Sequence, residues 1–62
     1  MTKKEMIQIA RSAIDKNMDY ETLYYSDYMY GNEKLTEDVY EYVIEAQEQG
    51  TNWFNEEYSE YL

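Results

Sequence analysis

The chain has 62 residues, of which 14 are acidic and 5 basic, with a net charge of −9 and no histidine, cysteine or proline. This length is enough for one small domain, so we expect residues 1–62 to form a single acidic helical domain. Without cysteine and histidine the chain lacks a thiolate nucleophile, the commonest general base and the commonest zinc ligands. We therefore expect no enzyme, no cofactor and no metal site.

Aromatic residues dominate the apolar part of the composition. Nine residues are tyrosine, whereas Leu, Ile, Val and Phe together make only 10 of the 62 residues. So few aliphatic residues with a high net charge are typical of disorder, but each aromatic side chain can bury roughly 150–250 Å². We therefore expect a folded domain with a thin core, which a homodimer or a partner protein would complete.

The charge is distributed unevenly along the chain. Residues 1–16 contain four basic and two acidic residues, whereas residues 17–62 contain 12 acidic residues and one base, Lys34. The acidic part would repel nucleic acids and anionic membranes, which excludes direct binding to either. No apolar run is long enough for a membrane span or a signal peptide, so we expect a cytoplasmic protein.

The first segment predicts an amphipathic helix from about residue 3 to residue 16. Thr2 and Glu5 have the spacing of a capping box, and Asn17 is suited to the left-handed conformation that ends a helix. The apolar positions recur with the helical period and define one inward face, formed by Met6, Ile7, Ala10, Ala13 and Ile14.

Residues 19–30 are ambiguous between a helix and a hairpin. Asp19 is a suitable N-cap and Gly31 a suitable stop for a short helix. The five tyrosines of this segment spread around a helical projection without forming one face. Tyrosine also favours strands, and Gly31 with Asn32 could form a hairpin turn. We favour the short helix and leave the hairpin open.

The third segment predicts a helix from Thr36 to Gly50. Thr36 is expected to be the N-cap, with Leu35 and Tyr40 forming a hydrophobic staple around it. Its inward positions follow the helical period, and they are Val39, Tyr42, Val43 and Ala46.

A fourth helix follows from about residue 52 to the end, capped by Thr51 or Asn52, with Phe54, Tyr58 and Tyr61 on one face. The whole pattern predicts an all-α bundle of three to four short helices.

A row of carboxylates runs along the third helix. Its members fall within about 80° of helical arc, with Asp38 at the margin, and they are Glu37, Glu41, Glu45 and Glu48. Each like-charged neighbouring pair costs about 0.2–0.5 kcal/mol, so local stability does not explain the row. It rises about 6 Å per four residues, which is comparable to the phosphate spacing of a nucleic-acid strand. A solvated face that serves solubility is the simpler alternative.

Further residues point to a protein interface around this row. Tyr40 and Ile44 border the glutamates, and an aromatic anchor beside charges is typical of binding surfaces. Tyr25, Tyr28 and Tyr40 are the tyrosines that we expect to be exposed for binding. The acidic surface continues in the last segment through Glu56, Glu57 and Glu60.

The acidic, tyrosine-rich segments LTEDVYEYVIEAQEQG (35–50) and NWFNEEYSEYL (52–62) resemble the small DNA-mimic proteins of phages and mobile elements. These include the Ocr-type anti-restriction proteins and several anti-CRISPR proteins. The resemblance lies in composition and pattern, and the basic first segment departs from it.

The resemblance implies an inhibitor that occupies the DNA site of a basic nucleic-acid-binding protein, such as a nuclease or its complex, in the host cytoplasm. The sequence leaves one alternative open. An acidic adaptor could regulate a host transcription factor or a toxin without imitating DNA.

Overall fold

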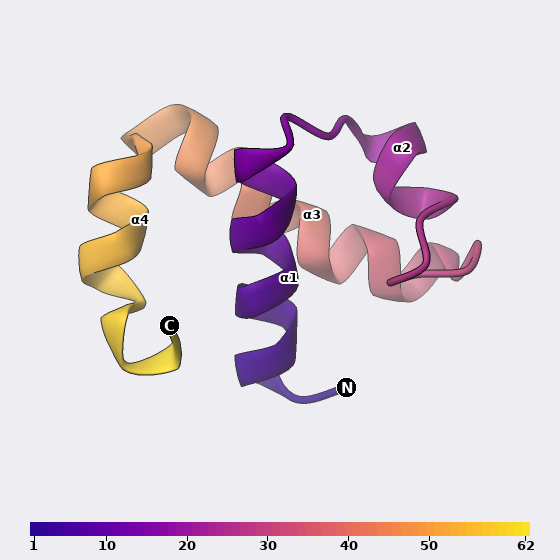
Figure 1. The fold of residues 1–62 in the computed structure, drawn as a ribbon, viewed down its shortest axis with the longest axis horizontal. Helices are drawn as coiled ribbons and strands as arrows, with labels where there is room; N and C mark the ends of the chain where they lie inside the picture. The colour runs from indigo at the N-terminus through magenta and orange to yellow at the C-terminus, as the bar shows by residue number, and fades with distance from the viewer.

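A computed structural model describes the whole chain, residues 1–62, as four α-helices and a final 3₁₀ turn. The elements are α1 (Lys3–Asp15), α2 (Tyr20–Tyr24), α3 (Glu33–Gln49), α4 (Thr51–Glu57) and η1 (Ser59–Tyr61). Figure 1 shows α1 crossing in front of the long α3, with α2 and α4 at opposite sides of the molecule. The all-α fold class and the number of short helices are confirmed, and the hairpin alternative is excluded.

The first helix follows the prediction closely. The Thr2 hydroxyl accepts a hydrogen bond from the Glu5 amide at 3.1 Å, and the Glu5 carboxylate accepts one from the Thr2 amide, so the capping box is complete. Asn17 follows the helix with a φ of 53°, in the left-handed region. Ile7, Ala10 and Ala13 are buried, as their spacing predicts.

The second helix is shorter than the sequence predicts. Asp19 caps it as expected, because its carboxylate accepts a hydrogen bond from the Thr22 amide at 2.8 Å. The helix nevertheless ends at Tyr24 rather than near Gly31. The Ser26 hydroxyl donates to the Leu23 carbonyl oxygen at 2.6 Å, and such local bonds compete with helix continuation. Met29 is buried within the turns that follow, which fixes them against the core.

The third helix has its N-cap four residues earlier than the sequence predicts. Asn32 is its N-cap, since its side-chain oxygen accepts a hydrogen bond from the Leu35 amide at 3.0 Å. Thr36 lies instead inside the helix, fully buried, and its hydroxyl donates to the Asn32 carbonyl oxygen at 2.6 Å. Thr36 lies one helical turn before Val39 on the same face, so burying that face requires Thr36 to be helical. The predicted cap and the Leu35–Tyr40 staple are therefore wrong.

Gly50 joins α3 directly to α4. Its φ of 99° ends α3 as predicted, and the same residue precedes the first residue of α4. No side chain caps α4, so the predicted cap by Thr51 or Asn52 is wrong. Gly50 itself occupies the N-cap position of α4, and it has no side chain that could accept a hydrogen bond. The predicted inward face of α4 is confirmed by the burial of Phe54.

Nine apolar side chains form the core, and no element buries more than three of them. α1 contributes Ile7, Ala10 and Ala13, and α3 contributes Val39, Val43 and Ala46. The remaining three are Leu23, Met29 and Phe54. Tyrosines and Trp53 pack half-buried around this cluster. This arrangement agrees with the expectation of a thin core.

Replacement of the true N-cap tests the boundary of α3. Asn32→Ala should lower the free energy of unfolding by about 1 kcal/mol, because one amide of the first turn loses its acceptor. The midpoint of thermal unfolding should fall by about 4–8 °C. Asn52→Ala is the matched control, since Asn52 is exposed and makes no capping bond. Equal midpoints for the two variants would show that Asn32 does not cap the helix.

Candidate functional site

The carboxylate row lies on the solvent side of α3. Glu37, Glu41 and Glu48 are exposed, whereas Val39 and Val43 on the opposite side of the helix are buried. The buried side faces the core that α3 shares with α1. The row therefore points away from the core and is accessible along much of the helix.

Two surface hollows flank the row. One, of about 260 Å³, is lined by Tyr20, Glu37, Tyr40, Glu41 and Ile44. The other, also about 260 Å³, is lined by Met6, Asp38, Glu41, Tyr42 and Glu45. Glu41 belongs to both hollows and stands on the ridge between them. Each hollow combines carboxylates with apolar or aromatic side chains, which is suitable for contacts with long basic side chains.

The row is almost free of internal counter-ions. Asp38, at its margin, forms an ion pair with Lys34 at 2.8 Å, and this hydrogen bond and its charge raise the pKa of Lys34. The only other ion pair of the molecule joins Arg11 and Asp15 within α1. Glu37, Glu41 and Glu48 form no ion pair, so their carboxylates are free to contact another molecule. The charges of Glu37 and Glu41 also contribute to the raised pKa of Lys34.

Glu45 differs from the other three glutamates of the row. Its carboxylate accepts a short hydrogen bond from the Tyr58 hydroxyl, which links α3 to α4. Burial, followed by the bond and charge of Glu45, raises the pKa of Tyr58. The Tyr58 ring also packs against its aromatic neighbours, which are Tyr42, Trp53, Phe54 and Tyr61. Glu45 thus has a structural role and is only half-exposed.

The three tyrosines predicted to be exposed are in different environments. Tyr25 is 72% exposed and Tyr28 36%. The Tyr28 hydroxyl, however, lies 3.3 Å from the Ser12 hydroxyl and accepts a bond from Lys16 at 3.2 Å. These two contacts, that with Ser12 first, lower the pKa of Tyr28.

Tyr40 is half-buried rather than exposed, because its ring packs edge-on against Tyr20 at 5.6 Å between centroids. It also packs against the core, which its predicted place beside the glutamates did not indicate. Ile44, 40% exposed, is the apolar side chain that borders the row.

The acidic residues of the last segment lie outside the row. Glu56, Glu57 and Glu60 are exposed on α4 and η1. They extend the acidic surface of the molecule but are carried by elements other than α3. The structure therefore does not combine all the predicted site residues into one continuous row.

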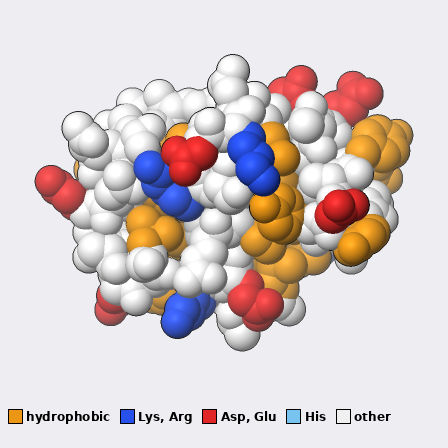
Figure 2. Space-filling view, in the orientation of Figure 1, with side chains coloured by type: hydrophobic (Ala, Val, Ile, Leu, Met, Phe, Trp, Pro, Cys, Tyr) orange, Lys and Arg blue, Asp and Glu red, His pale blue; other side chains and the backbone are white.

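The opposite face of the molecule has mixed charge. Four of the five basic residues belong to α1 or its C-cap, namely Lys3, Lys4, Arg11 and Lys16. Figure 2 shows this face, with Lys and Arg side chains lying over α1 and acidic side chains scattered around them. The basic side chains are therefore concentrated on α1, whereas the row on α3 contains none.

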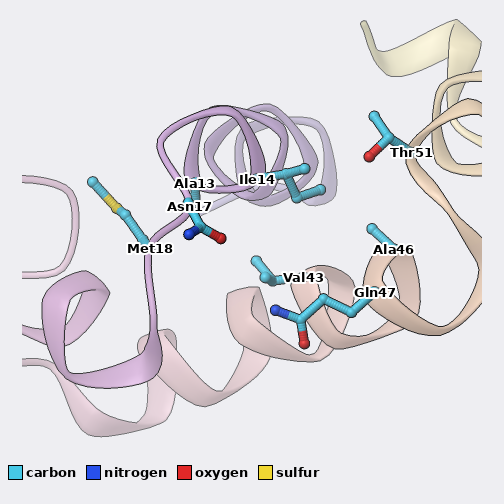
Figure 3. A pocket seen from close by; sticks show the side chains of 8 residues that line it. All are labelled: Ala13, Ile14, Asn17, Met18, Val43, Ala46, Gln47 and Thr51. Carbon is cyan, nitrogen blue, oxygen red and sulfur yellow. The ribbon is translucent and has the colours of Figure 1, made fainter.

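A small cavity lies between α1 and α3, away from the row. Figure 3 shows the eight side chains that line it, which come from the end of α1, the following turn, α3 and Thr51. Its volume is only about 80 Å³, and no acidic or basic side chain lines it. We assign no binding or chemistry to this space.

The sequence reasoning found only Tyr25 of one further group of residues. Tyr20, Glu21, Tyr24, Tyr25 and Glu33 line a third hollow beside α2. The signal was present, because a helix capped by Asp19 places Tyr20 and Tyr24 one turn apart on the same face. The spread of the five tyrosines hides this shared face, because a helical projection of residues 19–30 includes residues beyond Tyr24, where the helix ends.

No three potential metal ligands gather anywhere in the structure. None of the helices combines the length and apolar character required to cross a membrane. No known protein family, curated protein or solved structure matches this chain.

Removal of the Tyr58 hydroxyl tests its bond to Glu45. Tyr58→Phe should lower the free energy of unfolding at pH 7 by about 1.5 kcal/mol, the lower end for a hydrogen bond to a charged group. Urea unfolding measures this change. Tyr30→Phe is the control, because the Tyr30 side chain is exposed and its hydroxyl makes no hydrogen bond; it should leave stability unchanged.

A comparison of wild type with Tyr58→Phe also tests how the free energy of unfolding depends on pH. The folded state raises the pKa of Tyr58, so the unfolded phenol loses its proton first, above about pH 10. Wild-type stability should therefore fall as the pH rises above about 10, and Tyr58→Phe should lack this part of the loss. Parallel stability curves for wild type and Tyr58→Phe from pH 7 to 11 would contradict the assignment.

Proposed function

We propose that this protein is a DNA-mimic inhibitor that occupies the nucleic-acid groove of a basic protein, such as a defence nuclease. The observation that carries the proposal is the row of four glutamates on α3, of which Glu37, Glu41 and Glu48 are exposed and none forms an ion pair. A groove that binds phosphates with Lys and Arg can bind carboxylates by the same charge-assisted hydrogen bonds. Binding would also release counter-ions from both surfaces.

The linear density of charge supports this proposal. From Glu37 to Glu48 the helix rises about 16 Å, at 1.5 Å per residue. The four glutamates of the row lie along this length. One strand of DNA carries a phosphate about every 3.4 Å of axis, or roughly five over the same distance. The row therefore approaches the charge density of a single DNA strand.

The apolar side chains beside the row would slow dissociation, which charge alone does not do. Coulombic attraction between exposed groups is screened by salt and gives mainly the encounter rate. Ile44 and the half-buried Tyr40 line the hollow beside Glu37 and Glu41. Their desolvation against a partner would slow dissociation. This combination would give both fast association and a stable complex.

Charge-neutral variants of the row test the proposal. The probe is the set of proteins captured from a bacterial lysate, with and without excess duplex DNA. DNA should displace the relevant partner, and Glu37→Gln with Glu41→Gln should weaken its binding at least tenfold. The matched control, Glu57→Gln with Glu60→Gln, removes the same charge from α4 and η1 and should weaken binding less than threefold.

The stability of the same variants separates binding from folding. Glu37 and Glu41 are one turn apart, so neutralising them should hold or raise the free energy of unfolding, by about 0.2–0.5 kcal/mol. A captured partner that DNA does not displace would favour the adaptor alternative. If the Glu37/Glu41 variant binds with unchanged affinity, the row serves solubility and not binding.

Association kinetics across a salt series test the division of roles. Glu41→Gln should slow association and flatten its salt dependence, because steering depends on charge. Ile44→Ala should raise the dissociation rate and leave the salt dependence intact. Ile44 is a better choice than Tyr40, whose truncation would also remove its contact with Tyr20. If wild-type association does not change with salt, electrostatic mimicry is the wrong account.

A further inference from the structure

The hollow beside α2 is larger than either hollow along the row. Its volume is about 530 Å³, and its lining consists of three tyrosine rings and two carboxylates, those of Glu21 and Glu33. Tyr20 belongs both to this hollow and to the one that contains Glu37 and Glu41. Tyr20 therefore stands between the α2 hollow and the hollow beside Glu37, the N-terminal residue of the row.

The three rings form a wall of fixed geometry. Tyr20 and Tyr24 are stacked with their planes 15° apart and their centroids 6.2 Å apart. The Tyr25 ring packs edge-on against Tyr24, with 4.8 Å between the ring centroids, and the Tyr40 ring packs edge-on against Tyr20. Buried Leu23 and the cap by Asp19 hold α2 itself in place. The aromatic surface is thus arranged before any ligand arrives, which reduces the entropy lost on binding.

The hollow is also unbalanced in charge. No basic side chain lines it, and the nearby Lys34 is paired with Asp38. Burial, followed by the charges of Glu37 and Glu33, raises the pKa of the Tyr20 hydroxyl. The negative charge of these carboxylates therefore also acts on the tyrosine side chains of the hollow. Aromatic faces and carboxylates both attract cations. The chemistry of the lining therefore selects a positively charged, partly apolar group.

We infer that the α2 hollow receives an arginine side chain of the basic partner, with the guanidinium stacked on the tyrosine wall and directed at Glu21 and Glu33. Arginine fits better than lysine, because a planar guanidinium both stacks on rings and donates in a fork to carboxylates. The inference rests on the proposed function only for the basic nature of the partner. This arginine would anchor the interface at the place where the acidic row meets the aromatic surface.

A titration with a single amino acid derivative tests the inference without a partner. N-acetyl-arginine amide is added at millimolar concentration, and the ring protons of Tyr20, Tyr24 and Tyr25 are followed by NMR. Saturable shifts confined to these rings are expected. N-acetyl-citrulline amide, which has nearly the same shape but no charge, should bind at least fivefold more weakly, and N-acetyl-lysine amide at least twofold. Equal shifts with arginine and citrulline, or no saturable shift, would overturn the inference.

Two variants locate the binding. Glu21→Gln with Glu33→Gln should weaken binding of the arginine amide at least fivefold, whereas Glu57→Gln with Glu60→Gln removes the same charge elsewhere and should change it less than twofold. Tyr25→Ala, at an exposed ring, should weaken binding about twofold to fivefold. Amide spectra of each variant verify that the fold is retained. Equal weakening by both double variants would reduce the effect to general attraction and would refute a site.

The outcome is distinguishable from that of the proposed function. If DNA displaces the captured partner but Glu21→Gln with Glu33→Gln binds it normally, mimicry stands and the arginine site fails. If the arginine amide binds as expected but DNA displaces no partner, the arginine site stands and mimicry fails.

Discussion

The packing of α1 against α3 is the contact on which the other elements of this molecule depend. Ile7, Ala10 and Ala13 from one helix face Val39, Val43 and Ala46 from the other, so most of the side chains in this contact are small. Small residues allow two helices to approach closely, but they bury little apolar area. The remaining elements add what this contact lacks, since Leu23 anchors α2 and Phe54 anchors α4. Half-buried aromatic rings then cover the edges of the cluster.

This arrangement explains how α3 can carry a row of like charges. Tertiary contacts, rather than local charge pairs, give most helices in proteins their stability. The 17-residue α3 is held by its buried face and is capped by Asn32 and ended by Gly50. Its opposite face is therefore free to carry carboxylates at a modest cost in repulsion. Four of the five basic residues lie on α1 or its C-cap and form no ion pair with the row, so they do not neutralise it.

Tyrosine serves two purposes in this structure. As part of the fold, Tyr58 buries its ring among other aromatic residues and uses its hydroxyl to fix Glu45. At the surface, Tyr20 and Tyr24 form an ordered wall beside carboxylates. A ring with a polar tip suits both settings, because it can be half-buried without leaving a polar group unpaired. The excess of tyrosine is thus consistent with a small core and a large contact surface.

The sequence by itself determined the features that depend on nearby residues. The capping box at Thr2, the stop at Asn17, the end of α3 at Gly50 and the arc of the carboxylate row all follow from local spacing. Tertiary structure decided the rest. Both Asn32 and Thr36 can cap a helix, and only the burial of Thr36 shows that the helix starts at the first of them. Likewise, Glu45 and Glu41 look equivalent on a helical projection. The hydrogen bond from Tyr58, 13 residues from Glu45, makes them different. Contacts between distant segments cannot be predicted from the periodicity of either segment.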